Sequence, residues 1–164
     1  MDYIYCTPEW LEESARIYRA TPYFQEALKK VTTRICYRIT AEPKWGIDPD
    51  FIFGAIVTEG VLNDLRFFSE AEAREKADYI LAATPQEWKL ILRKEHKSIT
   101  DFTLGKIKLE QGSKTGVFTL VAPYANTFID ALTQVKLIFQ DELSPQQLDE
   151  YRQYASQFRS RLGV

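Results

Sequence analysis

The sequence has only one histidine and two cysteines among its 164 residues, too few for the usual ligand sets of structural zinc. Cys6 and Cys36 cannot form a disulfide framework, and we interpret both as reduced thiols, the first in a loop and the second in a strand. The seven glycines are scattered, so the sequence contains no glycine-rich phosphate-binding loop. We therefore expect no metal site and no cofactor.

Catalytic groups are also scarce. A Ser-His-Asp triad would have to use His96, which lies in a charged stretch and is interpreted as an ordinary surface residue. No Gly-x-Ser-x-Gly nucleophile elbow is present. Paired carboxylates such as Glu12 and Glu13 are adjacent in the sequence and point different ways on a helix. We expect no enzymatic activity, although an enzyme built on carboxylates alone stays open.

The charge and the hydrophobic runs narrow the class of protein further. The formal net charge of -2, with 21 basic and 23 acidic residues, argues against a nucleic-acid partner. No run approaches the roughly 18 apolar residues of a transmembrane segment, and Met1-Asp2-Tyr3 lacks the basic start of a signal peptide. We therefore expect a cytoplasmic protein, and the length predicts a single domain over residues 1–164.

Four helix starts share one pattern, a Ser or Thr followed by a proline, which suits the N-cap and the first helical position. They predict helices over about 8–19, 22–30, 85–95 and 145–161. In two of them Glu87 and Gln147 complete the pattern of a capping box. A fifth helix over about 126–139 is predicted from the helical spacing of its apolar residues, which are Phe128, Leu132, Val135 and Phe139.

Strand patterns fill the middle of the chain. In residues 32–41, Ile35 and Tyr37 alternate with Arg34, Cys36 and Arg38, which predicts one buried face and one exposed face. The other predicted strands cover about 51–58, 61–68, 77–83 and 106–110, and Ser69 to Lys76 is interpreted as a polar connection. Strands joined by short turns favour an α+β fold, with a five-stranded, mostly antiparallel sheet covered by helices on one face.

One stretch resembles the sterol carrier protein 2 (SCP-2) family. Its pattern is a strand that opens with Ala77-Asp78, a short helix with Trp88 inside, a second short helix that ends in Gly105-Lys106-Ile107-Lys108-Leu109, and then Gly112. The resemblance covers most of residues 31–140. The sequence departs from the family where both Glu110 and Gln111 precede the glycine, and the helix at 145–161 goes beyond the minimal family domain.

The resemblance implies an apolar tunnel between sheet and helices, and the binding or transfer of a sterol, fatty acid or fatty acyl-CoA without a reaction. The ten Phe, nine Tyr and three Trp supply the apolar bulk for such a wall, although each of them could simply fill the core. From their alternation or helical spacing we predict these wall residues: Ile35, Tyr37, Phe53, Leu81, Phe128, Leu132 and Val135.

Two questions stay open at this point. The alternative function is a regulatory or accessory domain of the same fold, which acts with a separate enzyme or as a homodimer. The C-terminal helix carries one apolar stripe on a polar background, and we expect it to be a lid over one end of the cavity rather than an interface. The stripe consists of Leu148, Tyr151, Ala155, Phe158 and Leu162.

Overall fold

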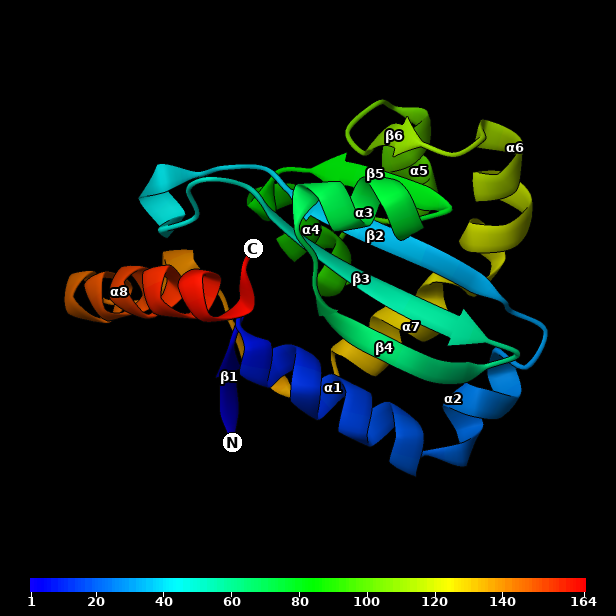
Figure 1. The fold of residues 1–164 in the computed structure, drawn as a ribbon, viewed down its shortest axis with the longest axis horizontal. Coiled ribbons are helices and arrows are strands. Elements are labelled where there is room, and N and C mark those ends of the chain that lie inside the picture. Colours follow the sequence, from blue (N-terminus) through cyan, green and yellow to red (C-terminus); the bar gives the residue numbers. More distant parts are fainter.

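The computed structural model describes residues 1–164, and it confirms the α+β fold with a five-stranded sheet (Figure 1). The strand order is β4-β3-β2-β5-β6, in which only the β2–β5 pair is parallel. The strands are β2 (Thr33–Ile39), β3 (Phe51–Thr58), β4 (Val61–Phe67), β5 (Tyr79–Ala83) and β6 (Lys108–Gln111).

Most helices pack on one face of this sheet, where they share a core cluster of 35 buried residues with it. Three helix starts are capped by the predicted hydroxyl, whereas Thr21 accepts no capping hydrogen bond. No helix combines the length and hydropathy that a membrane crossing needs. The helices are α1 (Pro8–Ala20), α2 (Pro22–Ala27), α4 (Pro85–Leu92), α5 (Ser98–Thr103), α7 (Ala125–Leu132) and α8 (Pro145–Leu162).

The other face of the sheet is covered too, by a helix that the sequence analysis missed. The expected polar connection is helix α3 (Glu70–Lys76), which lies in front of the sheet in Figure 1. Under it, Cys36 is 2% and Arg38 8% exposed, so the expected exposed face of β2 is largely buried. Glu70 of α3 accepts two hydrogen bonds of 2.7 Å from Arg38. Ala73 is the buried residue of α3. A helix that buries one small side chain needs no apolar stripe, so the sequence pattern did not predict it.

The predicted helix over 126–139 is wrong in its second half. Helix α7 ends at Leu132, and the chain then forms strand β7 (Lys136–Ile138), which pairs in parallel with β1 (Asp2–Ile4). The helical spacing of Val135 and Phe139 relative to Leu132 is therefore coincidental. The partner of β7 lies at the other end of the chain, so local periodicity could not reveal it.

Helix α8 closes the core at one end of the molecule, opposite the end where α6 (Lys114–Gly116) lies (Figure 1). The reciprocal hydrogen bonds between Ser144 and Gln147 form the predicted capping box. Three residues of the predicted stripe are buried, whereas Leu162 is 45% exposed. The buried ones are Tyr151, Ala155 and Phe158.

Candidate functional site

The register of the sheet places three predicted wall residues side by side. Tyr37 on β2 lies opposite Phe53 on β3 and Leu81 on β5. The Tyr37 ring stacks on Phe53, with 5.1 Å between the ring centroids, and Phe128 of α7 stacks with Tyr37 at 5.8 Å. The alternation of β2 thus directs Tyr37 to the face on which most helices pack, where it is part of an aromatic layer between the sheet and α7.

An apolar cavity, which we call the main cavity, lies between this part of the sheet and the helices. Its empty volume is about 680 Å³ including the part open to solvent. Of its 18 lining residues, 17 are hydrophobic, and Ser98 is the exception. Most of the lining comes from β2, β3 and β5, from α4 and α5, and from the helical segment 117–132, and Tyr5 and Ile107 complete it.

A second cavity adjoins the first. Its empty volume is about 400 Å³, again including the open part, and 11 of its 12 lining residues are hydrophobic. Four residues line both cavities: Tyr37, Val121, Ala125 and Phe128. The stacked rings of Tyr37 and Phe128 are therefore part of the walls of both cavities.

The fold was compared with known structures. A crystal structure of sterol carrier protein 2 superposes with a TM-score of 0.68 at 16% sequence identity, over 79% of this chain and 97% of the other. A conserved protein of Thermus thermophilus, suggested to be a sterol carrier protein, gives a TM-score of 0.69 at 15% identity, over 80% and 90% of the chains. The chain has the fold of sterol carrier protein 2. No family model and no curated protein sequence matches it.

The SCP-2 fold brings together most of the residues that the sequence analysis selected. Tyr37, Phe53, Leu81, Phe128 and Leu132 line the main cavity. Ile35 lines the second cavity. Val135 lines neither cavity, because it follows the end of α7 and packs against the core there.

Other lining residues were missed. Among them, Ile99 and Phe102 of α5 and the pair Val117 and Val121 line the main cavity. Helix α5 is too short to show a clear period, so sequence reasoning had little to detect there. Val117 and Val121 are four residues apart, a helical spacing that would have extended the predicted helix toward the N-terminus.

The cavity has few polar atoms and no strong base. Three lining residues carry a hydroxyl group, Tyr5, Tyr37 and Ser98, and the lining includes no carboxylate, histidine, lysine or cysteine. Burial raises the pKa of both Tyr5 and Tyr37 above that of an exposed tyrosine, so both hydroxyls stay neutral at pH 7.

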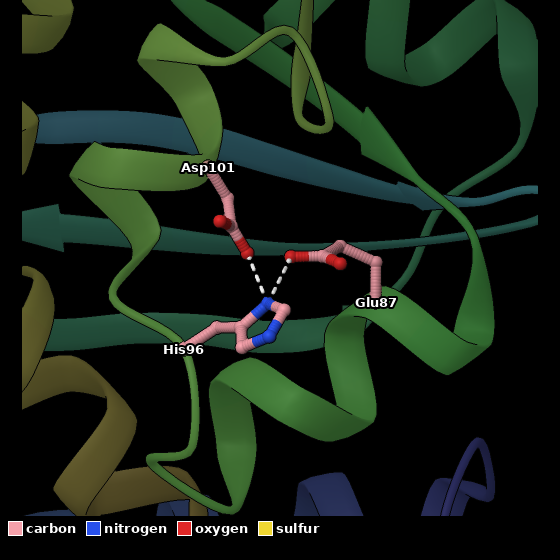
Figure 2. Close-up of side chains that lie close together, drawn as sticks. All are labelled: Glu87, His96 and Asp101. Atoms are coloured by element: carbon pink, nitrogen blue, oxygen red, sulfur yellow. Dashed lines mark hydrogen bonds and ion pairs between the residues drawn. The ribbon is translucent and has the colours of Figure 1, made fainter.

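His96 is not the ordinary surface residue that the sequence indicated. Its Nδ1 atom lies 2.6 Å from Oδ2 of Asp101 and 3.3 Å from Oε1 of Glu87 (Figure 2). The Glu87 side chain is therefore turned toward the histidine. The Thr84 hydroxyl caps helix α4 by accepting a hydrogen bond from the Glu87 N–H, but the Glu87 carboxylate makes no return bond to Thr84, so the predicted capping box is only half formed. The three side chains form a polar cluster. It lies beside the main cavity, since Trp88 follows Glu87 in the sequence, Phe102 follows Asp101, and both of these aromatic residues line the cavity.

Proposed function

We propose that the protein binds an elongated apolar molecule, such as a fatty acid, a fatty acyl-CoA or a sterol, in the main cavity and carries it without chemical change. The observation that carries this proposal is the lining, which is hydrophobic at 17 of 18 positions. Each methylene group that leaves water for such a surface contributes about 0.8 kcal/mol to binding. The likeness in fold to sterol carrier protein 2 supports the same class of ligand.

A role as a carrier rather than an enzyme agrees with the chemistry of the lining. Its neutral hydroxyl groups can donate hydrogen bonds to a ligand, but none has a base beside it on the cavity wall. The stacked rings of Tyr37 and Phe128 allow the bound length to vary, because their movement would add the second cavity to the first.

The test is to fill the cavity with a large side chain introduced by substitution. Ala125 borders both cavities, so Ala125→Trp places a large ring where the ligand would lie. Ala71 is exposed on α3, on the opposite face of the sheet, so Ala71→Trp is the matched control. Purified wild-type protein and the two variants are melted with and without fatty acids of 12 to 18 carbons (about the range of common membrane lipids) and a sterol.

For the wild type and Ala71→Trp we expect a ligand at a hundredfold excess over Kd to stabilise the fold by about 2.7 kcal/mol. For a chain of this length that raises the melting midpoint by about 5–11 °C. Ala125→Trp should fold and show no such rise. If no ligand of either class shifts the wild-type midpoint, and lipid extraction of the purified protein yields none, the carrier proposal fails and the regulatory alternative is favoured.

A further inference from the structure

The polar cluster of Glu87, His96 and Asp101 joins two helices and the segment between them. Glu87 belongs to α4, Asp101 to α5, and His96 to the connection, and all three side chains point toward one another (Figure 2). One carboxylate oxygen from each acid and Nδ1 of the histidine all lie within 4.8 Å of one another. Such a convergence of one nitrogen and two oxygen atoms can supply three ligands to a small cation.

Both carboxylates of the cluster are buried, and neither has a lysine or arginine as a partner. Only 10% of the Glu87 side chain and 5% of the Asp101 side chain are exposed. His96 is the one ion-pair partner of either, since no lysine or arginine lies within 4.0 Å of their oxygens. Two carboxylates that face each other out of water repel strongly, so a positive charge between them would stabilise this part of the fold.

We propose that the cluster is a binding site for a divalent transition-metal ion of the zinc type, with Glu87 Oε1, His96 Nδ1 and Asp101 Oδ2 as its ligands. Zinc binds imidazole nitrogen and carboxylate oxygen at about 2.0–2.2 Å, in sites that combine three protein ligands with one water. Two tetrahedral ligands at that distance lie about 3.4 Å apart. The present distances of 3.3 Å and 2.6 Å therefore need little change at Glu87 and a small opening between His96 and Asp101.

The orientation of the imidazole ring agrees with this role. As a ligand, Nδ1 has no proton, so the ring proton must be on Nε2. The Nε2 atom makes no hydrogen bond within the protein, and 32% of the His96 side chain is exposed, so water can accept the Nε2 proton. The same exposure gives an ion a way in from solvent.

A bound ion would also affect the main cavity. It would fix α4 to α5 through Glu87 and Asp101, whose neighbours Trp88 and Phe102 line the cavity wall. We therefore expect the ion to slow the exchange of a cavity ligand. The metal site itself does not depend on the proposed function, because ion binding is measured without any lipid.

The test uses the full chain, freed of metal by a chelator, and titrated with Zn²⁺ by calorimetry and with Co²⁺ by visible absorption. We expect one ion per chain, a higher melting midpoint with Zn²⁺, and the absorption bands of Co²⁺ in a low-coordinate site. His96→Gln and Asp101→Asn should each weaken Zn²⁺ binding at least tenfold. Glu95→Gln, at an exposed neighbouring carboxylate, is the control and should bind as the wild type does.

Two results would overturn the proposal. If the wild type binds no ion at millimolar Zn²⁺, the cluster is a hydrogen-bonded histidine between two carboxylates and nothing more. If both variants bind Zn²⁺ as tightly as the wild type, the ion lies elsewhere on the chain. Circular dichroism checks that each variant folds, and His96→Gln, at a partly exposed position, keeps the test decisive if Asp101→Asn does not fold.

Discussion

The Phe158→Ala substitution tests what the C-terminal helix does. Phe158 is 1% exposed, and its ring stacks on Phe51 of β3 and Phe67 of β4, with 5.4 Å and 5.5 Å between the ring centroids. No residue of α8 lines either cavity, so the prediction that this helix is a lid is wrong in this structure. Its apolar stripe instead covers one end of the sheet, and this suggests that α8 stabilises the fold without controlling access to the ligand.

The magnitude follows from the burial of the ring. Truncation of a fully buried phenylalanine to alanine removes its contacts and leaves a cavity, and it typically costs about 3–5 kcal/mol. For a chain of this length the melting midpoint should fall by about 6–20 °C. Leu162→Ala, on the same helix but 45% exposed, is the control and should change the stability by no more than about 0.5 kcal/mol.

The assay measures two quantities for each variant: the free energy of unfolding in urea, and the rate at which a fluorescent fatty acid leaves the protein well below the melting midpoint. We expect Phe158→Ala to lose stability and to release the fatty acid at the wild-type rate. A loss of stability below about 1 kcal/mol would contradict the packing argument. If a fully folded Phe158→Ala variant releases the fatty acid faster than the wild type, the helix does act as a lid.

Two further predictions concern the opposite face of the sheet. Hydrogen bonds from the Arg66 guanidinium lower the pKa of Glu72 to about 2. This pair therefore stabilises the fold fully above the unfolded pKa of about 4.3, and the stabilisation is lost as the pH falls toward 2. When unfolding in urea is measured from pH 7 to pH 2.5, Glu72→Gln should lose less stability than the wild type. Gly54 lies where a Cβ atom would come within 2.7 Å of the Cys36 sulfur and 2.8 Å of the Phe68 ring. Gly54→Ala should therefore lower the free energy of unfolding by about 1–3 kcal/mol. Adding Cys36→Ala should recover part of this loss, because it removes the sulfur atom that the new methyl group meets. If the losses of the two single variants simply add in the double variant, this explanation is wrong.

Local signals in the sequence determined much of the fold. The hydroxyl-proline pairs predicted where α1, α2, α4 and α8 begin, because capping and the fixed φ of proline act over a few residues. The alternation in β2 directed Ile35 and Tyr37 to the face on which most helices pack, because successive side chains of a strand point to opposite faces. Six of the seven predicted wall residues line at least one of the two cavities, and their contact with a ligand stays a prediction.

Only the tertiary structure decided the features that depend on distant partners. Strand β7 exists because Asp2–Ile4 pairs with it from the far end of the chain, which ends α7 early and excludes Val135 from the cavity wall. Helix α3 covers β2 with the buried Ala73 and with Glu70, which accepts hydrogen bonds from Arg38 of β2, so the helix has no apolar periodicity in its sequence.

The cluster around His96 has the same origin. Glu87 and Asp101 lie nine and five residues from the histidine, and these spacings carry no motif. The two side chains meet at His96 because of the path that the chain takes between α4 and α5. Propensity and periodicity act within a few residues, whereas burial and the meeting of charged groups are properties of the packed chain.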